Sequence, residues 1–124
     1  MARTASLPAA RNPLNNARQI LTPVAGVVPP PDPSLGHVCD ITLAANSTLA
    51  VPVYGSADAG PYAGERITFI IRQSGAGSFT LTYGAGYKAV GMALTASATA
   101  VDVHEFVFDG TTWNGCGKLL GATA

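Results

Sequence analysis

The fold of this chain is decided by the stretch RITFIIRQSGAGSFTLTY, which covers residues 66–83. Apolar residues alternate with polar ones on both sides of the central glycines, as they do in strands that bury one face. The glycines allow the positive φ values of a tight reversal, so we expect two strands joined by a short turn. The predicted apolar faces consist of Ile67, Phe69 and Ile71, then Phe79, Leu81 and Tyr83.

A second apolar segment, VDVHEFVFDGTTW, covers residues 101–113. Its Asp109-Gly110 dipeptide is a strong signal for a hairpin turn. Because valines and phenylalanines alternate in parity before this turn, both faces of the strand are apolar. We expect either a central strand that is buried on both faces or a strand with one face against another subunit. The candidate subunit-interface residues are Phe106, Phe108 and Trp113.

Further short alternating segments occur at residues 38–43, 48–54 and 93–97. Together with the two stretches above they make seven or eight short strands, separated by glycine-rich turns and without a helical pattern. This spacing is typical of two packed antiparallel sheets. The sequence therefore predicts an all-β domain over residues 37–124, a small antiparallel β-sandwich or jelly roll.

Residues 1–36 have a different composition, dominated by Ala, Pro and Asn. The prolines at positions 29–33 require an extended backbone near polyproline II. One short helix is predicted over residues 14–21, with Asn12 as its N-cap and Pro13 in its first turn. A helix this short is unstable alone in water. We expect either a disordered tail or, as the sharper hypothesis, an extended N-terminal arm that is ordered by a partner.

Charge and composition exclude several classes of partner. Charged residues make up 11% of the 124-residue chain and the net charge is zero, so no clustered Lys/Arg surface for nucleic acid is expected. No apolar run approaches the ~20 residues that span a bilayer. The N-terminus lacks the apolar core of a secretory signal, which favours synthesis in the cytoplasm. A net charge near zero favours association with other proteins.

The charges are unevenly divided between the two predicted parts. Residues 1–36 contain three arginines and one aspartate, a net of +2, whereas residues 37–124 contain four cations and six anions, a net of −2. A mildly basic arm on a mildly acidic body is consistent with the arm docking on a neighbouring acidic surface.

The sequence contains no recognisable catalytic constellation, so we do not expect an enzyme. Gly-x-Ser-x-Gly, His-Glu-x-x-His and Walker motifs are absent. Asp102, His104 and Ser97 are the residue types of a nucleophilic triad, but no strained turn presents the serine. The paired glycines of the turns lack the following helix that a phosphate site needs.

Neither a metal nor another cofactor is expected, because His37, Cys39, His104 and Cys116 lack metal-ligand spacing. The favoured interpretation of the two cysteines is that both are reduced and buried. A disulfide that joins the first strand of the domain to the last remains an alternative.

Residues 64–83 and 101–113 together resemble a β module of tailed-bacteriophage structural proteins. The shared pattern pairs a strand ending in R-Q-polar-G-x-G, here RQSGAG, with a later V-x-x-F-x-F-D-G-T-x-W, here VHEFVFDGTTW. The resemblance covers the C-terminal half to two-thirds of the chain, and the pattern contains no catalytic residues. This module is found in head decoration proteins and in tail-fibre or minor tail proteins.

The resemblance implies a capsid decoration (cement) protein on the outer surface of the virion, forming a homotrimer and binding the major capsid protein. In this hypothesis the arm bridges neighbouring capsid subunits. The alternative is a tail-fibre or baseplate tip that binds host-surface glycans, with Tyr54 and Tyr62 as candidate contacts. A glycan hydrolase is disfavoured because no carboxylate pair is recognisable. The predicted partner-binding residues of the arm are Arg3, Arg11, Leu14, Arg18, Ile20, Leu21, Val27 and Val28.

Overall fold

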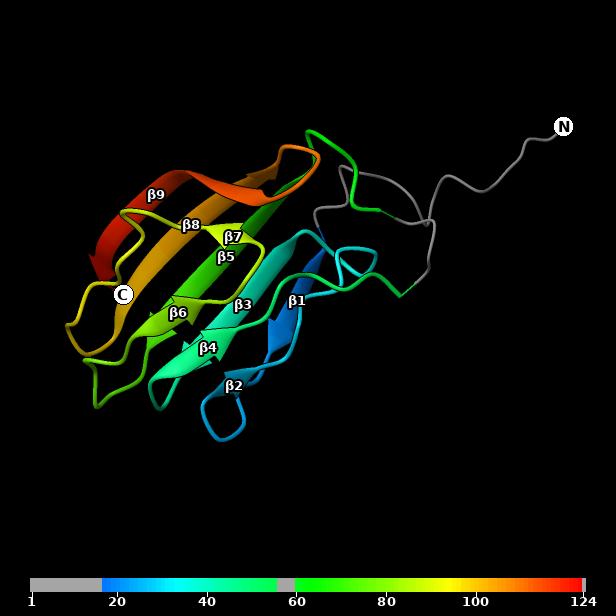
Figure 1. Cartoon of the computed structure of the whole chain (residues 1–124). Helices are drawn as coiled ribbons and strands as arrows, with labels where there is room; N and C mark the ends of the chain where they lie inside the picture. The colour runs from blue at the N-terminus through cyan, green and yellow to red at the C-terminus, as the bar shows by residue number, and fades with distance from the viewer. Residues whose placement is uncertain (1–16, 56–59, 124) are drawn as a thin grey trace, which may run out of the picture.

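The computed structural model describes residues 17–55 and 60–123, which form nine strands (Figure 1). The described residues contain no helix that is long and apolar enough to cross a membrane. The strands are β1 (Arg18–Leu21), β2 (Val27–Val28), β3 (Val38–Leu43), β4 (Ser47–Leu49), β5 (Arg66–Gln73), β6 (Leu81–Tyr83), β7 (Tyr87–Lys88), β8 (Ala100–Phe108) and β9 (Trp113–Thr123).

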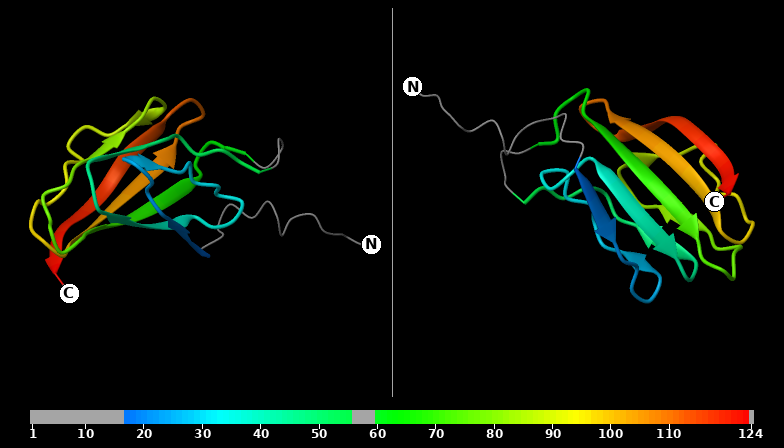
Figure 2. Two further views of the ribbon diagram at one scale, coloured as in Figure 1. Left: turned by 90° about the horizontal axis from the view of Figure 1, so that it is seen from below. Right: turned by 180° about the vertical axis from the view of Figure 1, so that it is seen from behind.

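The strands form two layers, which confirms the predicted all-β sandwich. The larger sheet has the order β1-β3-β5-β8-β9-β7, and the smaller sheet has the order β2-β4-β6. The smaller sheet packs on one face of the larger sheet, and the view from behind shows the opposite face uncovered (Figure 2). We call this uncovered surface the outer face.

The first six strands alternate between the two sheets, and this winding determines their direction. Each strand crosses to the other layer before the chain returns, so neighbours within a sheet run parallel: β1–β3 and β3–β5 in one layer, β2–β4 and β4–β6 in the other. Among the nine described strands, the antiparallel pairs are β5–β8 and β8–β9, and β7–β9 is parallel. The prediction of purely antiparallel sheets is therefore wrong, because consecutive strands pack across the layers instead of pairing side by side.

The glycine turn after β5 illustrates this difference. The turn is present as predicted: the Gly77 N–H donates to the Ser74 carbonyl at 3.0 Å, and Gly77 has a φ of 68°. However, β5 and β6 belong to different sheets, so they do not form a hairpin. Each strand has one apolar face, and both faces are buried when they point toward each other across the sandwich.

The second predicted turn does close a hairpin, between β8 and β9. The Asp109 carboxylate accepts hydrogen bonds from the backbone N–H groups of Thr111 and Thr112, each at 2.8 Å, and from the Asn114 side chain at 2.9 Å. The backbone donors of Thr112 and Thr111, followed by the Asn114 amide, hold the pKa of Asp109 well below its ordinary value. Gly110 supplies the positive φ of 102° that the turn requires.

The core lies between the sheets and is centred on a group of aromatic rings. Phe106 stands 4.8 Å from Tyr83 and 5.7 Å from Phe69, measured between ring centroids, and Phe108 packs on Trp113 at 5.1 Å. Phe106, Phe108 and Trp113 are 0%, 9% and 1% exposed. The prediction that these three residues form a subunit interface is therefore wrong, because they are already buried within the single chain.

Residues 17–36 belong to the sandwich, so the extended-arm prediction is wrong for this part of residues 1–36. Arg18–Leu21 forms a strand paired with β3, where a helix was predicted. Leu21 and Val28 point into the core at 6% and 0% exposure and do not face a partner. Strand pairing and core burial stabilise this segment, whereas an isolated short helix would gain neither. Arg3, Arg11 and Leu14 lie outside the described residues.

Candidate functional site: the outer face of the larger sheet

The outer face is formed by alternate residues of five strands, arranged in rows by the strand register. One row crosses the whole sheet and is mainly apolar. Each of its members is the register partner of the next. In order from β1 to β9 the row is Ile20, Asp40, Ile70, Val103 and Leu119.

The two ends of this apolar row are open to solvent. Ile20 is 68% exposed and Leu119 is 58% exposed, while Ile70 and Val103 between them are partly buried by their neighbours. A row of large apolar side chains across an uncovered sheet is typical of a contact surface for another macromolecule.

A cluster of ion pairs lies around the second member of the row. Asp40 accepts two hydrogen bonds from the Arg72 guanidinium, at 2.9 and 3.0 Å, and lies 3.4 Å from the Arg18 guanidinium. The hydrogen bonds from Arg72 lower the pKa of Asp40, and the charges of Arg72 and Arg18 add to this effect. The Asp40 carboxylate thus interacts with two planar guanidinium groups, and these charge-assisted contacts fix the side chains of Asp40 and Arg72 beside the apolar row.

A second ion pair on the outer face joins β5 and β8. The Arg66 guanidinium is 3.3 Å from the Glu105 carboxylate, and the Cys116 thiol lies 3.8 Å from the same carboxylate. Partial burial and then the charge of Glu105 raise the pKa of Cys116, so the thiol is not activated as a nucleophile.

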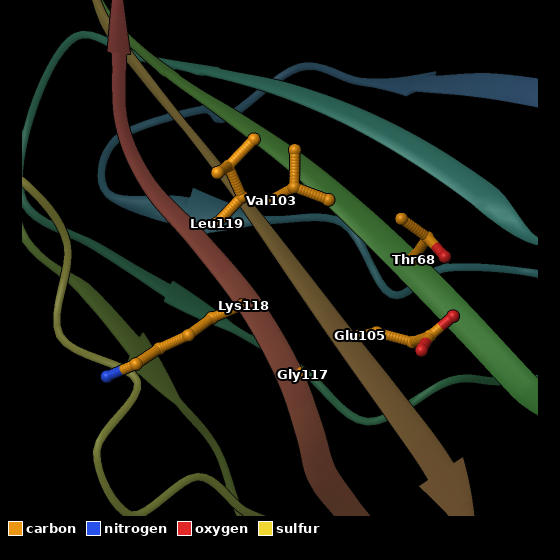
Figure 3. Close-up of a pocket in the computed structure, with 6 residues that line it drawn as sticks. All are labelled: Thr68, Val103, Glu105, Gly117, Lys118 and Leu119. Carbon is orange, nitrogen blue, oxygen red and sulfur yellow. The ribbon is translucent and has the colours of Figure 1, made fainter.

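A shallow depression of about 260 Å³ lies on this face between β5 and β9 (Figure 3). It forms because Gly117 has no side chain, and a Cβ added there would have no atom nearer than 3.8 Å. Val103 and Leu119 lie together on one side of it, while the Lys118 side chain points away (Figure 3). The residues that line the depression are Thr68, Val103, Glu105, Gly117, Lys118 and Leu119.

On the inner side of the same sheet, His104 is completely buried. The Tyr83 hydroxyl lies 2.6 Å from its Nδ1 atom, and its Nε2 atom has no hydrogen-bond partner among the described residues. Burial lowers the pKa of His104; the charge of Lys118 acts in the same direction and that of Asp102 opposes it. With its ring enclosed in the core, His104 is out of reach of a substrate, so the triad of Asp102, His104 and Ser97 has no access for its chemistry.

We expect acid to destabilise the protein through His104. Its folded-state pKa lies below the ordinary value of 6.5, so below about pH 6.5 the unfolded chain binds a proton that the folded chain does not. Stability should be greatest above this pH and should fall on acidification by up to about 1.4 kcal/mol per pH unit. The measurement is the free energy of unfolding in urea between pH 5 and pH 8. The His104→Asn variant, which keeps an acceptor near Nδ1 but does not titrate, should have a flatter profile, and an identical profile would contradict this assignment.

The remaining candidate residues are separated from one another. Cys39 is buried, and burial raises its pKa to about 12, whereas Cys116 is exposed on the outer face, and the two thiols are not bonded. The prediction that both cysteines are buried is therefore wrong for Cys116. The His37 Nε2 atom lies 2.7 Å from the buried Glu65 carboxylate. Within residues 17–55 and 60–123, no three His, Cys, Asp or Glu side chains are grouped to hold a metal ion.

Two residues of the predicted arm lie on this face. Arg18 and Ile20 were expected to contact a partner and do lie on the outer face, although in a strand of the sheet instead of an arm. The prediction missed Arg72, Asp40 and Leu119, which come from three other strands. The one available signal was the valine parity of β8, which indicated a second apolar face but could not identify which face was covered.

Comparison with family models and with curated protein sequences finds no match for this chain.

Proposed function

We propose that the chain is a non-catalytic structural protein of a tailed-phage virion, a decoration protein that binds the outer surface of the capsid and bridges neighbouring subunits. The observation that carries the proposal is the uncovered outer face, where the exposed Ile20 and Leu119 lie in one row beside ion-paired arginines. The resemblance of residues 64–83 and 101–113 to a module of head decoration and tail proteins supports a virion partner, of which we favour the capsid.

The shape and chemistry of the outer face favour a large protein partner. The depression on it is shallow and open, while sites for small molecules are concave and enclose most of the ligand. Its arginines are already paired with Asp40 and Glu105, so the surface has little free charge to attract an ion. Apolar burial at about 25 cal/mol per Å² over a few hundred Å² would supply the favourable term for binding.

The N-terminal residues remain a second predicted contact. Arg3, Arg11 and Leu14 precede the described part of the chain, and the sequence-based expectation that they contact a neighbouring capsid subunit stays a prediction. The first described residues are followed directly by β1, which carries Ile20. A contact made through residues 1–16 would therefore continue onto the same edge of the outer face.

The tail-fibre alternative receives less support from the aromatic side chains. Glycan sites present exposed rings, but Tyr83 and Tyr87 pack against the core and Trp113 is 1% exposed. Tyr54 is partly buried, and burial together with the nearby Glu65 raises its pKa. Of the two candidate glycan contacts, only Tyr62 is exposed, at 38%.

The test is a single charge on the exposed end of the apolar row. Ile20→Lys should weaken capsid binding by at least about tenfold, equivalent to about 1.4 kcal/mol, because the ammonium must lose water in the contact. The variant should still fold, since Ile20 is 68% exposed and its register partner is the acidic Asp40. Binding is measured by co-sedimentation with heads of the encoding phage prepared without this protein.

Val90→Lys is the matched control, because Val90 is fully exposed and lies in a loop outside the larger sheet. It should bind as the unmodified chain does. Equal binding by Ile20→Lys and Val90→Lys would reject the outer face as the capsid contact. A failure of the unmodified chain to bind heads, together with binding on a glycan array, would favour the tail-fibre alternative.

A further inference from the structure

The larger sheet has one long edge that no described strand covers. β9 runs from Trp113 to Thr123, and β8 pairs with it along almost this whole length. On its other side, β7 pairs only with Trp113 and Asn114. Among residues 17–55 and 60–123, no strand pairs with this side of β9 beyond Asn114. Such an edge is a template for another strand.

The backbone groups of the open edge can be assigned from the neighbouring hydrogen bonds. The Phe108 N–H donates to a carbonyl beside β5 at 2.8 Å, and the Trp113 N–H donates to a carbonyl before β7 at 2.9 Å. Phe108 and Trp113 are register partners, and their backbone groups therefore point away from each other, toward β5 and β7. β8 keeps a regular register with β5, so the backbone N–H and C=O of His104, four residues before Phe108, also point toward β5. The register partner of His104 is Lys118, whose backbone N–H and C=O therefore point to the open edge.

The edge carries little that would prevent pairing with another strand. Residues 115–123 contain no proline, and Lys118 is their only charged residue. Its ammonium donates to the Gly91 carbonyl, which holds the side chain away from the outer face. Natural edge strands are usually protected by charged side chains, prolines or a covering loop. Residues 88–92 contact this stretch at Gly115 and Lys118, but among the described residues they make no backbone hydrogen bond to β9 beyond Asn114.

The opposite edge of the sheet, formed by β1, is the other strand through which copies could pair. The Gln19 side-chain amide of β1 donates to the carbonyls of Asp32 and Gly36, at 2.8 and 2.9 Å, and so attaches the 32–36 loop beside that edge. A head-to-tail contact from β9 to β1 would leave the same two edges open at the ends of the assembly. An antiparallel contact between two β9 strands instead uses the same groups on both copies and closes on itself.

We propose that β9 is the interface of a two-fold symmetric homodimer, in which the β9 strands of two copies pair antiparallel and join the two larger sheets. A net charge of zero brings no overall repulsion between the copies. Leu119, 58% exposed on the outer face, stays accessible for the proposed capsid contact, because the pairing uses the backbone edge of β9 and not this face. The proposal stands independently of capsid binding and is made in place of the expected trimer.

The test places a proline at Lys118, whose backbone N–H points to the open edge of β9. Lys118→Pro removes an N–H that points away from β8, so the internal β8–β9 pairing is kept while the intermolecular ladder loses a donor. Lys118→Ala is the matched control, because it removes the same side chain and keeps the N–H. In sedimentation equilibrium the unmodified chain and Lys118→Ala should have twice the chain mass of 12.6 kDa. Lys118→Pro should have the mass of a single chain. Circular dichroism checks that each variant is folded.

A cysteine scan gives a second readout that does not depend on the proline variant. In a Cys116→Ser background, single cysteines are placed in turn at positions 117–120 and oxidised with copper phenanthroline; the unmodified Cys116 covers position 116. An antiparallel two-fold pair brings only one residue opposite its own copy, so one position should cross-link and its neighbours should not. The buried Cys39 serves as an internal control that stays reduced.

A mass of one or three chains for the unmodified protein would overturn the proposal. So would a folded Lys118→Pro variant that keeps the doubled mass, or the absence of a cross-link at all five positions. If deletion of residues 1–16 were needed before the doubled mass appeared, the edge would be occupied by the chain's own N-terminal residues, and the proposal would again be wrong for the full chain.

Discussion

A chain that lacks residues 1–36 is expected to be unfolded, although these residues have the composition of a tail. The deletion removes β1 and β2 and with them the buried side chains of Leu21 and Val28. Each of these side chains contributes about 1.5–3 kcal/mol by burial. Their loss also uncovers β3 and β4 and leaves parts of both sheets without a neighbour, against a total stability of about 5–15 kcal/mol for a domain.

The matched control is a deletion of residues 1–16, which keeps all nine described strands. This shorter chain should keep the β-sheet circular dichroism spectrum and a cooperative thermal transition, while the longer deletion should lose both. If the longer deletion folds with an unchanged melting temperature, then β1 and β2 do not contribute to the core as described, and the arm hypothesis over residues 1–36 regains its basis.

The Phe106→Ala variant should lose about 3–5 kcal/mol of unfolding free energy, the usual cost of emptying a fully buried aromatic site. Phe106 is 0% exposed and its ring contacts those of Phe69, Tyr83 and Tyr87 at centroid distances of 4.8 to 5.7 Å. Urea denaturation monitored by Trp113 fluorescence measures the change, because that side chain is the only tryptophan of the chain.

Val103→Ala is the comparison variant, on the same strand but on the outer face. It should cost about 1 kcal/mol or less, as expected for a partly exposed side chain. The subunit-interface hypothesis for Phe106 makes the opposite prediction, namely a change in assembly with little change in stability. A small loss of stability in Phe106→Ala would therefore contradict the core position.

The predictability of the candidate site differed from strand to strand. The β8 valines indicated an outer apolar face, because parity within one strand is a local property. The neighbours of that face were not predictable: Ile20 lies 83 positions before Val103 in the chain, yet both belong to one row. Such a row exists only once β1, β3, β5 and β8 are in register.

The sequence by itself determined the local features of this protein. The alternation of Ile67, Phe69 and Ile71 specified a half-buried strand, and Asp109-Gly110 specified the β8–β9 hairpin, whose turn residues bond to their own backbone. Both depend on contacts between residues that are close in the chain, so a local pattern contains the information needed.

Only the tertiary structure decided which strands are neighbours and which residues are buried. Arg18–Leu21 forms a strand because it pairs with β3 and because Leu21 is buried in the core. Neither condition can be inferred from those four residues alone. The glycine turn after β5 connects two layers, which the local sequence also could not show. The apolar faces of the two strands indicate that each must be covered, but not which strand covers it. Pairing and coverage are set by the total burial of the whole sandwich, which no single segment contains.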